Sequence, residues 1–308
     1  MLATFGSITC ASSPPKLKSL SLVPLSCGNI SASSARDFDS AYERGWSGGQ
    51  GNADSMHAYR RESVEYYYTD PAGRASASGS GSNLGAPTDE NIRFLERTIK
   101  AYAVQTMVDV PCGDVNWQFG GWRVDSLRGY VGLDILARLL RLNEKRFAFH
   151  SNKIFARWDV SSCAIPQVQL SESSGPSPPD LVHMRYLLQH LTLTKALAVL
   201  INVAESGARL LAVTTYPSSV RGNSTRNPNL EQGKETHFYM NDLDRPPFSM
   251  PPPLTCSKHG EGKHSPGLLC LYDMKSVRES GWVEKVRRTR IVGAHRSTRF
   301  MCGDRRCR

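Results

Sequence analysis

Short apolar runs alternate with longer amphipathic stretches between residues 88 and 272. The runs are rich in β-branched and aliphatic residues, as expected of strands buried on both faces of a parallel sheet. The stretches between them place apolar residues at helical spacing. Because alternating strands and helices form a parallel sheet covered on both faces, the sequence predicts an α/β fold with a Rossmann-like, mostly parallel sheet. The predicted strands are 107–110, 130–133, 154–160, 180–185, 208–215 and 268–272, and the main predicted helices are 88–102, 135–147 and 194–204.

The first of these strands ends in a sharp turn, and the second ends in a carboxylate. Pro111 and Gly113 break the apolar run that ends at Val110, so the chain must turn there. Asp134 closes the second strand about twenty residues beyond the glycine, which is where doubly wound folds bind a ribose. The pattern therefore predicts a nucleotide-like cofactor at this edge of the sheet.

The turn also carries a recognisable motif, Asp-x-Pro-Cys-Gly-Asp-x-x-Trp. It resembles the first motif of a poorly characterised group of class I S-adenosylmethionine-dependent methyltransferases. The resemblance implies the class I methyltransferase fold with S-adenosylmethionine as cofactor. One glycine and two acidic residues suit a cationic sulfonium and an ammonium better than a pyrophosphate, because opposite charges stabilise each other. The alternative is a βα turn that binds no cofactor. The residues of the motif are Asp109, Pro111, Cys112, Gly113, Asp114 and Trp117.

The third predicted strand ends in Trp158 and Asp159. Similar enzymes place an acidic residue here on the adenine amino group, so the resemblance implies this role for Asp159, with Trp158 beside the adenine ring. A single aromatic residue in a strand is also typical of ordinary core packing, and this remains the alternative for Trp158.

The fourth predicted strand and the helix after it resemble the fourth motif of the same family. Asp180, Arg185, His190 and Leu191 match it, whereas Tyr186 replaces the usual acidic residue. Catalytic groups in open α/β sheets come from the carboxyl ends of strands. A histidine there can accept the proton of a hydroxyl acceptor, because its ordinary pKa lies near neutral pH. A buried, hydrogen-bonded core histidine is the alternative. The candidate catalytic residues are His183, Arg185, Tyr186 and His190.

The composition of both ends differs from that of the centre. Residues 1–36 contain no acidic residue and are rich in serine, which is typical of an organellar transit peptide or of an untargeted tail. With the polar residues that follow, we predict a tail and irregular arm over 1–77. The glycine-serine run at 78–82 has the composition of a flexible linker, whereas the resemblance implies a loop that closes over the cofactor. The methyltransferase domain is therefore predicted over 78–273.

Residues 274–308 are predicted to be a basic tail outside the core. Residues 275–308 hold eleven lysines and arginines against three acids, which accounts for +8 of the chain's net charge of +10. Because the rest is nearly neutral, the charge does not indicate a nucleic-acid-binding domain, and RNA could bind only through the tail. Truncation after Asp273 is expected to preserve the fold, although Trp282, Val283 and Val286 have the spacing of one short docked helix.

Two further expectations concern the loops and the compartment. The Ser/Pro-rich stretch 167–179 is predicted to be an exposed or disordered loop. The eight cysteines show neither a Cys-x-x-Cys pair nor zinc spacing, so neither a disulfide framework nor a metal site is predicted. The apolar stretches near the start are too short for secretion or membrane insertion. An intracellular location, cytoplasmic or organellar, is therefore expected.

The predicted function is methyl transfer to an unidentified acceptor, most simply a small molecule. The cofactor supplies the reactive methyl group, and the protein aligns donor and acceptor without a metal. After the fourth strand the chain lacks the Asn/Asp-Pro-Pro-Tyr/Phe motif that the resemblance associates with amino groups of adenine or glutamine. A non-catalytic nucleotide-binding scaffold of the same fold, favoured by Tyr186, and an RNA methyltransferase that uses the basic tail are the alternatives.

Overall fold

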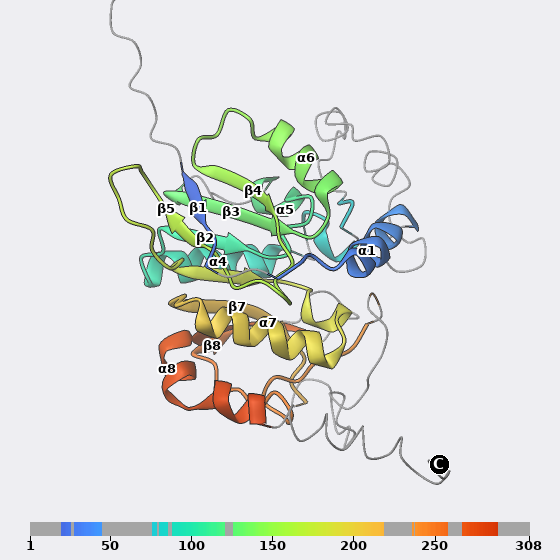
Figure 1. The fold of residues 1–308 in the computed structure, drawn as a ribbon, viewed down its shortest axis with the longest axis vertical. Coiled ribbons are helices and arrows are strands. Elements are labelled where there is room, and N and C mark those ends of the chain that lie inside the picture. Colours follow the sequence, from blue (N-terminus) through green and yellow to red (C-terminus); the bar gives the residue numbers. More distant parts are fainter. Residues whose placement is uncertain are drawn as a thin grey trace, which may run out of the picture.

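The computed structural model describes residues 20–25, 28–44, 76–78, 80–85, 88–120, 126–218, 236, 238–257 and 267–288. Within these residues the main feature is a seven-stranded sheet with the order β4-β3-β2-β6-β7-β9-β8 (Figure 1). Its strands are β2 (Thr106–Asp109), β3 (Gly129–Asp134), β4 (Lys153–Arg157), β6 (Leu181–Met184), β7 (Leu210–Thr215), β8 (Thr255–Cys256) and β9 (Leu268–Asp273). The helices beside them are α4 (Asp89–Ala101), α5 (Asn116–Gly120), α6 (Ala137–Arg146), α7 (Leu193–Glu205) and α8 (Met274–Glu279).

The connections wind outward from the middle of the sheet in two directions. β2 pairs in parallel with β3 on one side and with β6 on the other, and β4 and β7 extend these two halves in parallel. β9 then pairs antiparallel with both β7 and β8. The predicted Rossmann-like, mostly parallel sheet is thus confirmed. Open sheets of this kind bind ligands outside the carboxyl ends of the strands, where the strand order reverses, and here that point lies between β2 and β6.

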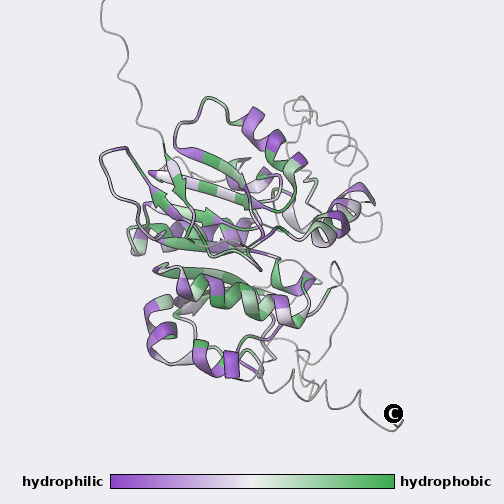
Figure 2. Cartoon of the chain, viewed as in Figure 1, coloured by the Kyte–Doolittle hydropathy of each residue, from purple (hydrophilic) through white to green (hydrophobic). Residues whose placement is uncertain are grey.

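The two faces of the sheet carry separate apolar clusters, because side chains alternate along each strand. Val108 and Val182 belong to one cluster, in which Leu200 of α7 also packs. Met107 and Leu181 belong to the other, together with apolar residues of α4. Figure 2 shows the strands mainly in the colours of hydrophobic residues and the outer sides of several helices in those of hydrophilic residues. Helices therefore cover both faces, as predicted.

The N-terminal region contributes more structure than we predicted. Ala32–Arg44 forms helix α1, and its Tyr42 is buried, so an irregular arm is wrong for this part of 1–77. Ser21–Val23 forms strand β1, which pairs antiparallel with β5 (Gln167–Gln169). Val168 in β5 is buried in the core, so the prediction of an exposed loop over 167–179 is wrong as well. Most of the proposed transit peptide lies outside the described residues, because residues 1–19 are not described. Residues 45–75 of the predicted arm lie outside them as well.

The predicted boundary after Asp273 is also wrong. α8 begins at Met274, and a further helical segment follows it up to residue 288. Trp282, Val283 and Val286 are buried in the same cluster as α7. Burial of these apolar side chains holds the segment against the core, even though its composition is basic. The core therefore extends at least to residue 288, and the rest of the predicted tail lies outside the described residues.

One disulfide bond contradicts the prediction from cysteine spacing. Cys256 and Cys270 are directly paired across β8 and β9, and their sulfurs are bonded. The two cysteines are 14 residues apart, so only the antiparallel pairing brings them together.

Among the described residues, no helix has the length and apolar character that crossing a bilayer requires.

The buried position of Trp282 leads to a test of the domain boundary. Trp282→Ala should lower the free energy of unfolding by about 3–5 kcal/mol, because it removes a large buried side chain and leaves a cavity. Glu284→Ala, an exposed position on the same segment, is the matched control and should change stability by less than about 0.5 kcal/mol. Urea unfolding of the three proteins measures both effects. Equal stability of the tryptophan variant and the wild type would show that the segment lies outside the core.

Candidate ligand-binding site

The turn after β2 has the sharp geometry that its sequence predicts. Gly113 has a φ of 60°, in the left-handed region that favours glycine. A Cβ atom at this position would lie 2.5 Å from Ser78 Oγ, so the close approach of a second segment also requires glycine. The Cys112 amide donates to the carbonyl of Leu133 and ties the turn to β3. The turn is thereby fixed at the carboxyl edge of the sheet.

Asp134 lies at the end of β3, beside this turn. The Gly113 amide donates to its Oδ2 atom at 3.2 Å, and the Leu136 amide donates to its Oδ1 atom at 3.1 Å. Burial raises the pKa of this carboxyl group to about 6, and the two backbone donors offset only part of the effect. Further donors, such as the hydroxyls of a ribose, would stabilise the charged form.

Asp114 is covered by the segment that precedes α4. Its carboxylate accepts hydrogen bonds from the Ser76 hydroxyl, the Ala77 amide and the Ser78 hydroxyl. The hydroxyl of Tyr42 in α1 lies 3.0 Å from Ser78 Oγ. Burial raises the pKa of Asp114, while the bonds from Ser76 and Ala77 oppose the shift. These donors hold the segment over the turn, in the place where the resemblance predicts a closing loop.

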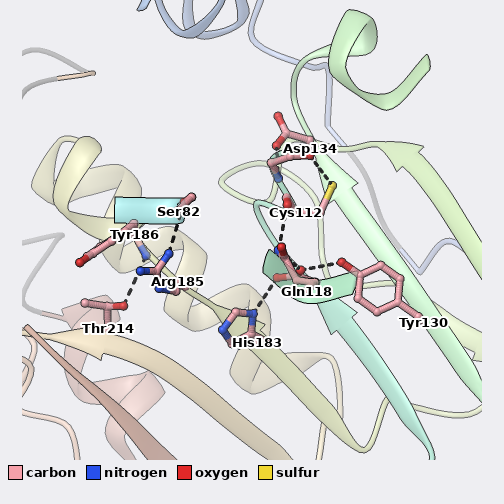
Figure 3. Close-up of polar contacts among 11 residues, drawn as sticks. Ser82, Cys112, Gln118, Tyr130, Asp134, His183, Arg185, Tyr186 and Thr214 are labelled. Carbon is pink, nitrogen blue, oxygen red and sulfur yellow. Dashed lines mark hydrogen bonds and ion pairs between the residues drawn. The ribbon is translucent and has the colours of Figure 1, made fainter. Parts of the chain in front are cut away.

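Asp109, by contrast, faces other side chains of the protein. Its Oδ1 atom lies 2.7 Å from His183 Nδ1, and its Oδ2 atom accepts from the Tyr130 hydroxyl at 2.6 Å and the Gln118 amide at 2.9 Å. Figure 3 shows these contacts converging from β3, α5 and β6. Burial, followed by the negative charge of Asp109, raises the pKa of Tyr130, so its hydroxyl remains a donor. Asp109 was predicted as a cofactor contact, but three side chains already occupy its carboxylate.

Several buried acceptors near the turn have no partner among the described residues. They are His183 Nε2, Gln118 Oε1 and Asn143 Oδ1. The amide of Gln118 already donates to the carbonyl of Cys112, and that of Asn143 donates to the carbonyl of Gly113. Together with three buried carboxylates, these acceptors favour a ligand that brings hydrogen-bond donors and positive charge. Cys112 itself is buried, and burial raises its pKa well above the ordinary value, so it is a poor nucleophile here.

Trp158 and Asp159 follow β4, which ends at Arg157, three residues before the predicted end at 160. The Trp158 amide donates to the backbone carbonyl of Asp134, so both residues lie at the predicted edge. Asp159 accepts from the Ser31 amide just before α1 and from the amide and hydroxyl of Ser161. The Trp158 indole donates to a backbone carbonyl and packs against the core. The contacts of Asp159 therefore join it to the N-terminal segment.

Arg185 and Tyr186 connect β6 to the segment that covers the turn. Arg185 donates to the Gly81 carbonyl at 2.6 Å and to the Ser82 hydroxyl at 3.3 Å, both in the short helix η1 (Ser80–Ser82). Its guanidinium carbon lies 5.3 Å from the ring centre of Trp117 and 4.3 Å from that of Tyr186. These two cation–π contacts stabilise the arginine at the carboxyl edge of β6. The glycine-serine run is thus ordered, and the flexible linker reading is wrong for its described residues.

His190 lies in a different environment from His183. It ends the short helix η3 (Leu188–His190), and its ring centre is 5.9 Å from that of Phe238. The Tyr239 amide donates to the Gln189 carbonyl, which brings Phe238 to this place. The side chain of Phe238 is 51% exposed, whereas His183 is fully buried. The structure therefore places His190 near the surface and His183 in the interior.

Sequence reasoning missed Tyr130, Gln118, Asn143 and Phe238. One signal was present for the first two: Asp109 and His183 are ionisable residues within otherwise apolar strands, and such residues require buried hydrogen-bond partners. Phe238 had no comparable signal, because it reaches the site only through backbone pairing with a distant segment.

The raised pKa of Asp134 predicts a pH-dependent stability. Between about pH 4 and pH 6 the folded chain binds more protons than the unfolded chain, so the free energy of unfolding falls as the pH rises. The shift from 3.8 to about 6 corresponds to a loss of about 3 kcal/mol. Asp134→Asn lacks this titration. Urea unfolding at pH 4.5 and pH 7 should show a smaller loss for the variant, and equal losses would contradict the assignment.

Comparisons with known proteins find only distant similarity of fold. No protein-family model matches the chain, and no curated protein matches it. Similar solved structures include the N-methyltransferase NodS of Bradyrhizobium japonicum WM9 with S-adenosylhomocysteine, which is 11% identical with a TM-score of 0.46 and covers 69% of this chain and 96% of that chain. The methyltransferase domain of bacterial CtHen1 is 13% identical with a TM-score of 0.42 and covers 61% of this chain and 99% of that chain. Magnesium protoporphyrin IX methyltransferase of Synechocystis PCC 6803 with S-adenosylmethionine is 11% identical with a TM-score of 0.41, covering 79% and 98%. These similarities are too distant to assign a function to this chain.

Proposed function

We propose that this chain is an S-adenosylmethionine-dependent methyltransferase that acts on a small-molecule acceptor. The observation that carries the proposal is the group of buried carboxylates and unpartnered acceptors around a turn with a single glycine. Asp114 and Asp134 flank Gly113, and Asp134 has the position of a ribose ligand at the end of the second parallel strand. Ribose hydroxyls and an ammonium supply the donors that these groups accept.

The charge of the site also distinguishes between nucleotide classes. A dinucleotide cofactor brings a pyrophosphate, which needs backbone amides exposed by several glycines at a helix N-terminus. Here the turn has one glycine, and the adjacent side chains are buried acids. Like charges repel strongly at low dielectric, so a pyrophosphate fits poorly, whereas a sulfonium is stabilised.

The residues of this chain would perform the reaction mainly by positioning. S-adenosylmethionine, when bound, supplies an electrophilic methyl group. Asp134 would hold the ribose, and the segment from Ser76 to Ser82 would exclude water above the turn. Arg185 would fix this cover to the end of β6. The acceptor would then approach over the carboxyl ends of β6 and β7, where the Tyr186 amide donates to the Thr214 hydroxyl.

His190 is the candidate for handling the acceptor's proton. It is partly buried and lies beside the exposed Phe238, so an acceptor could reach it from the surface. Phe238, the exposed apolar side chain beside it, suits an acceptor with apolar surface. His183 is enclosed and bonded to Asp109, so we do not assign it this role.

A non-catalytic scaffold of the same fold is the second candidate. It is favoured by the donors that already bond Asp114 and Asp159, and by Tyr186 in place of the usual acidic residue. Methyl transfer from radiolabelled cofactor into a metabolite extract distinguishes the two, because only an enzyme labels the extract. The RNA methyltransferase alternative depends on basic residues of which most lie outside the described residues.

Cofactor binding gives the direct test of the proposal. Calorimetry with S-adenosylhomocysteine should show binding to the wild type. Asp134→Ala should weaken it at least about tenfold, because two hydrogen bonds to a charged acceptor are worth roughly 1.5–3 kcal/mol each. Glu284→Ala is the control with an exposed carboxylate removed elsewhere, and its affinity should equal that of the wild type. No binding to the wild-type chain would refute the proposed cofactor.

The role of His190 can be tested once the extract screen has yielded an acceptor. If that acceptor is a hydroxyl, His190→Gln should lower turnover by about 100-fold or more, since general base catalysis commonly contributes this much. The dependence of the rate on pH that a histidine base produces should also disappear. His150→Gln, an exposed histidine on another loop, should retain both. Wild-type turnover with an unchanged pH profile in the His190 variant would exclude it as the base.

A further inference from the structure

Hydrogen-bond donors around Asp109 determine the tautomer of His183. Tyr130 and Gln118 both donate to Oδ2, which leaves Oδ1 for His183. An ionised carboxylate only accepts hydrogen bonds, so His183 Nδ1 must be the donor in this pair. In a neutral imidazole the other nitrogen then carries a lone pair and no hydrogen. His183 Nε2 is therefore an acceptor.

This acceptor is buried without a partner. His183 is fully buried, and Nε2 forms no hydrogen bond with any described residue. Leaving such an atom unsatisfied costs about 1–3 kcal/mol. Its surroundings are mostly fixed: the ring meets the edge of Trp117 at 5.6 Å between centres, and Arg185 lies over the same indole. A lone pair held at this cost indicates a place for a donor from a ligand.

The two polar neighbours of Trp117, His183 and Arg185, suggest which donor this is. His183 Nε2 has a lone pair for a donor, and the guanidinium of Arg185, which lies over the same indole, carries positive charge. An α-amino acid group combines an ammonium, which only donates, with a carboxylate, which suits an arginine. A methyl acceptor must enter and leave, whereas the amino-acid end of a cofactor can remain enclosed. The buried histidine therefore fits the cofactor better than the acceptor.

We propose that His183 accepts a hydrogen bond from the ammonium of the cofactor's amino-acid end, and that Asp109 is the positioning residue that holds its ring in this tautomer. The inference rests on the proposed function and changes two assignments. Asp109 does not contact the cofactor, because three side chains use its carboxylate. His183 contacts the ligand and takes no part in removing the acceptor's proton.

The tautomer can be measured without any ligand. Long-range ¹⁵N–¹H spectra of the chain with labelled histidine should show His183 protonated at Nδ1 in the wild type. In Asp109→Asn the preference for this tautomer should be lost, because an amide can present either a donor or an acceptor to the ring. Addition of S-adenosylhomocysteine to the wild type should shift the Nε2 resonance. A wild-type ring protonated at Nε2, or a tautomer insensitive to Asp109, would overturn the proposal.

A pair of ligands separates the contact from a purely structural role. S-adenosylhomocysteine has the amino-acid end, and 5′-methylthioadenosine lacks it but keeps the nucleoside. His183→Asn retains a donor toward Asp109 and has no atom in place of Nε2, so the network should remain. Calorimetry should show about a tenfold loss of affinity for S-adenosylhomocysteine and less than about a twofold change for 5′-methylthioadenosine.

The other outcomes have distinct meanings. Equal losses for both ligands would assign His183 a structural role and overturn the proposed contact. No loss for either ligand would also overturn the contact. If the wild-type chain binds neither ligand, the proposed cofactor fails, and the inference that rests on it fails as well. If the wild type binds both ligands and His183→Asn binds each of them as tightly as the wild type does, the inference fails and the proposed cofactor stands.

Discussion

The arrangement of the elements at the carboxyl edge of the sheet depends on how the buried carboxylate of Asp109 is compensated. A fully buried carboxylate without donors would be strongly destabilising, and here three donors compensate it. They come from residues 9, 21 and 74 positions away in the chain, on α5, β3 and β6. One side chain therefore holds four elements in register where the strand order reverses. The turn after β2 takes its position from this network, and the surrounding carboxylates take theirs from the turn.

Six of the seven strands of the central sheet could be predicted from the sequence because each carries its own signal, whereas β8 has only two residues and was not predicted. An apolar run such as that of β7 is buried on both faces and reads as a strand without knowledge of its neighbours. β1 and β5 carry no such signal, since each has three residues and depends on pairing with a segment more than a hundred positions away. Between 274 and 288 the basic composition predicted a tail, although Trp282, Val283 and Val286 have helical spacing and prove to be buried. Composition described the exposed side of that segment and not the buried one.

The candidate site, like the fold, could be predicted from the sequence only in part. Asp134 and Gly113 could be placed from sequence, because the turn and the strand end are local features. Asp109 is part of the same motif, yet its partners could not be read from the motif, since Tyr130 and His183 reach it only through the pairing of parallel strands. The motif therefore indicates only which edge of the sheet carries the candidate site, whereas the partners of each carboxylate follow from the strand pairing.

The hydrogen bonds of residues 76–78 and 80–82, which cover the turn, have a kinetic consequence for the proposed function. The hydroxyls and amides of these residues bind Asp114, and the carbonyl of Gly81 binds Arg185, so both ends of this cover are anchored to the sheet. If the proposed ligand binds beneath it, several of these bonds would have to break before that ligand could leave. Opening of such covers, and not bond chemistry, commonly limits the overall rate of an enzyme. For this fold the lifetime of the closed state would then decide how long a spent ligand blocks the next cycle, and so how far its accumulation slows the protein.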